Sequence, residues 1–139
     1  MDLATLMFIA YRAMDEQVVR AVRAAGYEVT VAQARLAQRI APDGSRLTDL
    51  AQQAQVTKQT ASLLIAALER EGLVERVPDP ADRRARLIRL APKGLAASER
   101  AQQTVIRVEQ AWKQHLGPEL AESLTEALTR LREITDPYR

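Results

Sequence analysis

The arginines of one short stretch are the residues whose type and spacing most clearly indicate chemistry. The stretch PDPADRRARLIRL, residues 78–90, places four arginines in the seven positions from Arg83 to Arg89. No acidic residue lies among them, and Lys93 extends the basic run. Guanidinium groups bind phosphate oxygens through several hydrogen bonds at once. The stretch is therefore either a surface turn that only faces water or a hairpin that binds phosphates.

Other kinds of chemistry are excluded or weakly supported by the residue types. The 139 residues include no cysteine and a single histidine, His115. That composition excludes disulfides, thiolate metal sites, thiol-based redox sensing and a histidine metal cluster. We find no nucleophile–base set and no glycine-rich phosphate loop, so an enzyme is the weakest hypothesis. We expect no catalytic residue, no metal and no cofactor.

Composition and charge favour a small helical protein. Apolar residues make up 47% of the chain but aromatic residues only 4%, so alanine, leucine and valine must build the core. Alanine and leucine are strong helix formers. The net charge is only +2, so a local basic patch indicates an anionic partner better than the total does. The N-terminal segment has no basic start and no long apolar run; we expect a cytoplasmic protein without a membrane segment.

The spacing of apolar residues predicts six helices. Apolar side chains recur at intervals of three and four, and proline, glycine and threonine mark the expected ends. The predicted helices span residues 2–24, 31–41, 47–54, 58–71, 92–116 and a last segment after Gly117-Pro118 that carries Leu120 to Ile134. The expected N-caps are Thr30, Thr48 and Thr57, and the expected glycine ends are Gly26 and Gly72.

A hairpin is predicted between the fourth and fifth helices. Residues 73–77 and 86–90 have strand character, and a proline-containing turn over 79–82 separates them. Ile88 and Leu90 lie two positions apart and should share the inner face. The tip is expected near Arg83 and Arg84.

The order of these elements is that of a winged helix-turn-helix: a short helix, a tight turn, a second helix and a hairpin with a basic tip. An α-helix fits the major groove of duplex DNA. Protruding arginines can reach the neighbouring minor groove, where a narrow width concentrates negative potential. Their contacts with phosphates would also release counterions, which drives much of the affinity for DNA.

The sequence resembles the MarR-type (multiple-antibiotic-resistance regulator) transcription factors. The resemblance rests on residues 47–94, LTDLAQQAQVTKQTASLLIAALEREGLVERVPDPADRRARLIRLAPKG, and above all on the motif DPxDRR. It implies a mostly α fold with a small β-hairpin wing, flanked by N- and C-terminal dimerisation helices. By position, residues 30–92 would form the DNA-binding lobe, and residues 1–28 with 93–139 the dimerisation lobe of a homodimer. Each subunit would bind half of a pseudopalindromic operator in double-stranded DNA.

The resemblance also implies which residues contact DNA. The helix over 58–71 would be the recognition helix, and Arg84 would enter the minor groove with Asp82 as its orienting partner. The expected DNA-binding residues are Thr57, Lys58, Gln59, Thr60, Ser62, Leu63, Asp82, Arg83, Arg84 and Arg86. Gln59 can pair with adenine, and Leu63 can pack on a thymine methyl. Thr57 is expected to act mainly as a cap, and Arg46 and Thr48 are further candidates for phosphate contact.

Leu63, Ala66 and Ala67 stand where many relatives carry polar residues. Because few side chains are left for base contacts, recognition of the DNA shape by the wing would matter more. The same departure motivates an alternative hypothesis, a protein-interaction adaptor that keeps the winged-helix fold.

Many relatives sense small aromatic ligands in a cavity between the two lobes. The candidates for such an effector site are Tyr11, Arg35 and Trp112. Residues 120–134 form an apolar seam that would pack within the chain or, as we favour, against a partner helix. We therefore expect a ligand-responsive, dimeric transcriptional repressor.

Overall fold

The computed structural model describes residues 1–138 and contains six helices and one hairpin over that range. The helices are α1 (Leu3–Ala24), α2 (Val31–Ala37), α3 (Leu47–Ala54), α4 (Lys58–Arg70), α5 (Pro92–Leu116) and α6 (Pro118–Thr135). The strands β1 (Val74–Asp79) and β2 (Asp82–Leu90) pair antiparallel between α4 and α5. The predicted fold class, mostly α with a β-hairpin wing, is confirmed.

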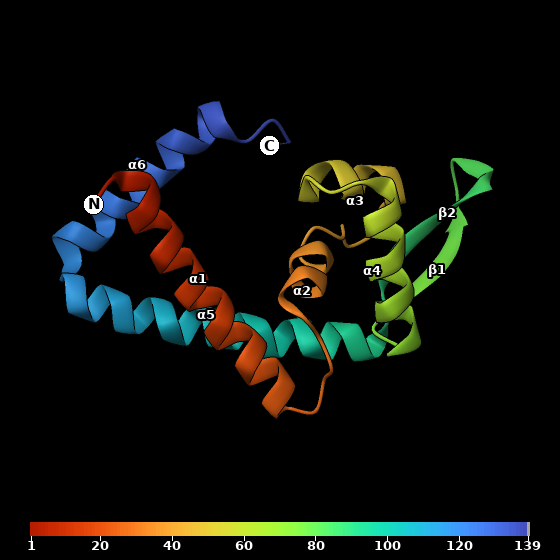
Figure 1. Ribbon diagram of the computed structural model, residues 1–139, viewed down its shortest axis with the longest axis horizontal. Coiled ribbons are helices and arrows are strands. Elements are labelled where there is room, and N and C mark those ends of the chain that lie inside the picture. The colour runs from red at the N-terminus through yellow and green to blue at the C-terminus, as the bar shows by residue number, and fades with distance from the viewer. Residues whose placement is uncertain (139) are drawn as a thin grey trace.

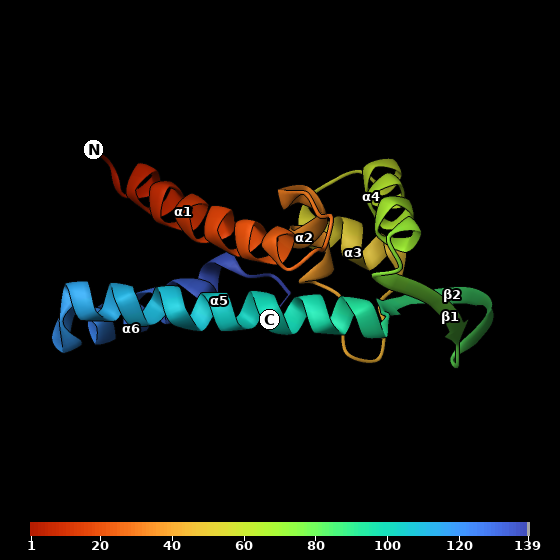
Figure 2. The ribbon, with the colours of Figure 1, turned by 90° about the horizontal axis from the view of Figure 1, so that it is seen from below.

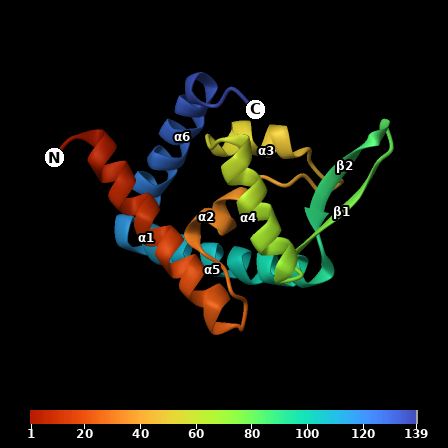
Figure 3. The same cartoon turned by 45° about the vertical axis from the view of Figure 1, so that its right-hand side comes forward.

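The long helix α5 connects the two ends of the molecule. It starts beside the hairpin, and α1 packs across it further along (Figure 1). At its far end the chain turns at Gly117 into α6, which packs against α5 and runs back along it in the view of Figure 2. Helices α2, α3 and α4 form a separate group next to the hairpin, which projects from that side (Figure 3). No helix among residues 1–138 is long and apolar enough to cross a membrane.

The core joins the three short helices to the hairpin. Its largest fully buried side chains come from α2, α3, α4 and β2, and they are Leu36, Leu50, Ile65, Leu68 and Ile88. Burying a side chain of this size contributes roughly 1.5–3 kcal/mol. The hairpin base and α4 are therefore held by the same core.

Most helix ends follow the local sequence signals. Thr30 forms a capping box with Gln33. Gly26, at φ +96°, closes α1 in the left-handed region that glycine adopts most easily. Thr48 was wrong as a cap, because α3 starts at Leu47 and its N-cap residue is Arg46, which makes no side-chain capping bond.

Helix α2 ends at Ala37, four residues earlier than expected. The amide groups of Arg39 and Ile40 bond to carbonyls three residues back, which is a tight turn and not a continued α-helix. Ala41 precedes Pro42, and the residue before a proline is disfavoured in helical conformation.

The wing is longer on its second strand than expected. Asp79 pairs with Asp82, so only Pro80 and Ala81 form the turn. Arg83 and Arg84 therefore lie in β2 just after the tip and not in a loop. Ile88 is buried and Leu90 packs on the core, which confirms the predicted inner face.

Candidate nucleic-acid interface

Helix α4 separates a buried face from an exposed one. Ala61, Ile65 and Leu68 face the core. The residues predicted to contact DNA lie on the other side: Lys58, Gln59 and Thr60 are exposed, Ser62 is half-buried, and Leu63 is 67% exposed. These side chains are therefore accessible from outside the molecule.

The start of α4 is closed by two threonines. The Thr57 hydroxyl oxygen accepts the Thr60 backbone N–H at 3.0 Å, and the Thr57 hydroxyl donates to the Thr60 hydroxyl at 2.9 Å. Thr57 is thus a cap, as the sequence predicted. The N–H groups of the first turn give this end a positive potential that suits a phosphate.

The wing presents exposed arginines beside α4. Arg83, Arg84 and Arg86 are all exposed. Within residues 1–138, the ion pairs of the hairpin involve other cations: Arg76 with Glu69, Arg89 with Glu75, and Arg46 with Asp79. The three exposed guanidinium groups are therefore not neutralised by a carboxylate of the described chain, and they are available to an external anion.

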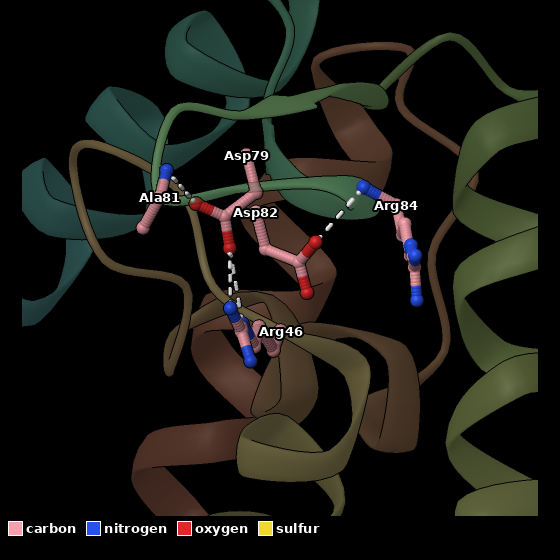
Figure 4. A network of polar contacts seen from close by, with 5 residues as sticks. All are labelled: Arg46, Asp79, Ala81, Asp82 and Arg84. Atoms are coloured by element: carbon pink, nitrogen blue, oxygen red, sulfur yellow. Dashed lines mark hydrogen bonds and ion pairs between the residues drawn. The ribbon is translucent and has the colours of Figure 1, made fainter.

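Asp82 acts on the backbone of the wing. Its Oδ1 accepts the backbone N–H of Arg84 at 3.0 Å (Figure 4). Such a bond from an aspartate to the amide two residues on is typical of an Asx turn. Asp82 thus orders the main chain that carries Arg84, while the Arg84 side chain points away from the carboxylate in Figure 4.

A residue that the sequence reasoning missed ties the wing to α3. Asp79, at the end of β1, is only 6% exposed and accepts two hydrogen bonds from Arg46, from Nε at 3.0 Å and Nη2 at 2.8 Å. Its other oxygen accepts the Ala81 backbone N–H at 2.8 Å (Figure 4). The Ala81 bond first and the Arg46 bond second hold the pKa of Asp79 below its usual value. The aspartate next to a proline signalled a turn, but nothing local signalled the pairing with Arg46.

The candidate effector residues Tyr11 and Arg35 lie together. Arg35 lies on α2, and its guanidinium contacts two residues of α1. It is 5.2 Å from the centre of the Tyr11 ring and 2.7 Å from the Asp15 carboxylate. The bond to Asp15 is the main reason that the pKa of Arg35 is raised. Trp112 is half-buried on α5. Asp15, almost fully buried, was not foreseen as the partner of Arg35.

An apolar cavity lies where α1 and α5 meet the winged-helix part. Its volume is about 80 Å³, and its wall includes Val18, Val22, Val29, Leu68, Leu73 and Ala97. Tyr11, Arg35 and Trp112 do not line this cavity. The three candidates therefore lie outside this cavity.

The arrangement of α3, α4 and the hairpin defines the class of the protein as a winged helix-turn-helix. Residues 27–85 match the sequence model of the MarR family. No curated protein sequence matches the chain. Residues 27–85 therefore belong to the MarR family, and the resemblance carried by the DPxDRR motif is confirmed.

Solved structures share the fold over nearly the whole chain. The transcriptional regulator Tm0710 from Thermotoga maritima is 26% identical, with 96% of this chain and 92% of that chain covered and a TM-score of 0.66. The transcriptional repressor CouR, bound to a 23-mer DNA duplex, is 26% identical with 94% and 92% covered and a TM-score of 0.72. MarR itself shares the fold at 23% identity, with 96% of each chain covered and a TM-score of 0.79. Family and fold together indicate a transcriptional regulator.

Proposed function

We propose that the protein is a dimeric, sequence-specific DNA-binding regulator, and specifically a ligand-responsive repressor in the cytoplasm. The observation that carries the proposal is the group of exposed arginines Arg83, Arg84 and Arg86, which are not paired with carboxylates of the described chain and lie beside an exposed recognition helix. If the arginines only kept the protein in solution, there would be no reason for them to be unpaired and next to such a helix. The similarity to a repressor bound to a DNA duplex supports the same reading.

The two parts of the interface would read different grooves. The first turns of α4, from Thr57 through Leu63, enter the major groove, where Gln59 pairs with adenine and Leu63 packs against a thymine methyl. The wing reaches the adjacent minor groove through Arg84, with Arg83 and Arg86 on the flanking phosphates. Asp82 keeps the backbone of Arg84 in place. Arg46 is a weaker candidate for a phosphate contact, because Asp79 already binds it.

The exposed apolar side chains at the far end of the molecule support a homodimer. They come from α1 and α6, and they include Leu3, Leu6, Phe8, Leu120, Leu124, Leu128 and Ile134. Large apolar side chains exposed in this number are typical of an interaction site. A second copy would cover it, so residues 1–28 and 93–139 would form the dimerisation lobe. The two recognition helices would then enter major grooves ~10 bp apart on a pseudopalindromic site.

An effector would act by changing the position of the two winged-helix lobes. A small aromatic molecule that binds near Tyr11, Arg35 and Trp112, or that widens the apolar cavity, would favour dimers unable to match the operator spacing. The cavity of about 80 Å³ suits a small apolar group without rearrangement.

The test is titration of the purified protein against labelled DNA from its own upstream intergenic region, with excess unrelated competitor. We expect a competitor-resistant complex of one dimer per site, and its loss in Arg84→Ala. An adaptor would instead retain a protein partner and lack DNA binding in both forms. The absence of specific binding to any genomic fragment would refute the regulator.

A further inference from the structure

We propose that Asp79 and Arg46 form a positioning pair that sets the angle of the wing, and thereby the contribution of its arginines to DNA binding. The proposal rests on the proposed DNA-binding function. Neither residue needs to touch DNA: their role is to hold the outer part of the hairpin in one place relative to the recognition helix.

Asp79 is the point at which the tip of the wing is attached to the rest of the lobe. Its neighbours Pro78 and Pro80 are exposed, yet Asp79 itself is buried. One carboxylate oxygen accepts the Ala81 N–H and shapes the turn, while the other accepts both bonds from Arg46 (Figure 4). A single carboxylate therefore joins the geometry of the turn to the first residue before α3. A buried carboxylate with both oxygens satisfied is expensive to move, because displacement leaves hydrogen-bonding groups unpaired.

Two consecutive residues hold the wing at two places. The Ser45 N–H donates to the Ile88 carbonyl and the Ile88 N–H donates to the Ser45 carbonyl, both at 2.8 Å, which fixes the base of the hairpin. Arg46, the next residue, holds the tip at Asp79. A hairpin attached only at its base could pivot about Ile88, whereas a second attachment fixes its direction.

The arginines lie on the part of the wing that this second attachment controls. From Asp82 to Arg86, strand β2 is exposed except for the half-buried Ala85, so core packing does not fix it. Arg46 is the N-cap residue of α3, which packs against α4. The pair thus connects the recognition helix, through α3, to the strand that carries Arg83 and Arg84.

The sign of the charge effect separates this role from simple electrostatics. Asp79→Asn removes a negative charge close to the proposed DNA surface, which by charge alone should tighten binding. The positioning role predicts the opposite, because asparagine can still accept the Ala81 bond but loses the charged pair with Arg46. Arg46 is 46% exposed, so a direct phosphate contact by Arg46 is the competing reading.

The experiment is a double-mutant cycle of operator affinity, measured by fluorescence anisotropy with the full-length dimer. We expect Asp79→Asn to weaken binding about tenfold, in the range of a lost base contact. In the Arg84→Ala background the same change should cost clearly less than in the wild type, because the main group that it positions is gone and only the contacts of Arg83 and Arg86 still depend on the wing. Arg46→Gln, which leaves the turn bond intact, should behave like Asp79→Asn.

The matched control is Glu75→Gln, which removes a carboxylate from the same hairpin, where it pairs with Arg89 at 2.7 Å. Its operator affinity should be unchanged or slightly higher. Thermal unfolding of every variant, followed by circular dichroism, identifies any loss that comes from unfolding at the assay temperature. A second, structure-sensitive readout is a pair of footprints. In Asp79→Asn, protection from hydroxyl radicals, which attack the sugars from the minor groove, should be lost at the wing, while protection of guanine N7 from methylation in the major groove should be kept.

Several outcomes overturn the inference. Equal or tighter binding by Asp79→Asn would do so, as would an Asp79 effect that is undiminished in the Arg84→Ala background. Weakening by Arg46→Gln without weakening by Asp79→Asn would assign Arg46 to a phosphate instead. Specific binding by the wild type together with any of these results refutes the positioning pair alone, whereas no specific binding by the wild type refutes the proposed function and the inference with it.

Discussion

Gly94 offers the sharpest stability prediction, because a methyl group at this position would meet backbone. Gly94 is the third residue of α5 and is buried against the end of the loop that leads from α4 into β1. A Cβ built there lies 1.9 Å from the Leu73 carbonyl oxygen and 2.9 Å from its carbon. The same oxygen accepts the Ala91 N–H at 3.0 Å. No change of side-chain rotamer can relieve the contact.

The expected size of the Gly94→Ala effect follows from three opposing contributions. A carbon–oxygen contact needs ~3.3 Å, so the start of α5 and Leu73 must separate by about 1.4 Å. Displacing packed backbone by that amount costs ~3 kcal/mol, at the upper end for overpacked cores. Loss of the Ala91–Leu73 hydrogen bond adds ~1 kcal/mol, and the better helix propensity of alanine returns ~1 kcal/mol. We therefore expect Gly94→Ala to lower the free energy of unfolding by about 3 kcal/mol.

The assay is urea unfolding followed by circular dichroism at a fixed protein concentration, because dimerisation makes apparent stability concentration-dependent. Gly26→Ala is the matched control: its φ is +96° but a Cβ there meets nothing within 4 Å. Only the backbone penalty of ~1 kcal/mol applies to that variant. A Gly94→Ala protein as stable as the wild type, or more stable than Gly26→Ala, would refute the packing described at this junction.

Three further predictions concern the cap, the apolar surface and the wing carboxylate. Thr57→Ala should lower the free energy of unfolding by ~1 kcal/mol in the same urea assay, since Thr60 loses its capping acceptor; no change would mean that the cap is not maintained in solution. Leu128→Glu should give a monomer by light scattering, because it places a charge on the exposed apolar face of α6, whereas Glu122→Gln should leave the dimer intact. The pKa of Asp79 is lowered in the folded protein, so its ionised form stabilises the fold. This stabilisation is fully present above the unfolded-state pKa of ~3.9. It is lost as the pH falls through the lower folded-state pKa. Acid titration of Asp79→Asn should therefore show a shallower loss of stability below pH ~4 than the wild type, and identical acid profiles would contradict the assignment.

Local sequence signals predicted the elements well where one residue determines the outcome. Pro92 and Gly117 delimit α5, and Thr57 starts α4, because each acts on its own turn of backbone. Thr48 was wrong as a cap, because α3 starts one residue before it and its N-cap residue, Arg46, makes no side-chain capping bond.

Contacts between residues far apart in the chain could not be predicted from the sequence. Arg46 and Asp79 are 33 positions apart, and Arg35 meets Asp15 across 20 positions. Which of several arginines finds which carboxylate depends on how helices pack, and no periodicity encodes that. The exposed wing arginines were predictable, by contrast, because they follow the turn of the hairpin, away from the core position of Ile88.

The most direct test of the proposed DNA-binding role is the salt dependence of operator binding by the wild type and by Arg84→Ala. If ~8 phosphates are contacted, log K should fall with log salt with a slope of about −7 for the wild type. Arg84→Ala should bind more weakly, with a slope shallower by about one unit. Affinity that does not change with salt, or wild-type and Arg84→Ala curves that coincide, would contradict the claim that the wing arginines bind DNA.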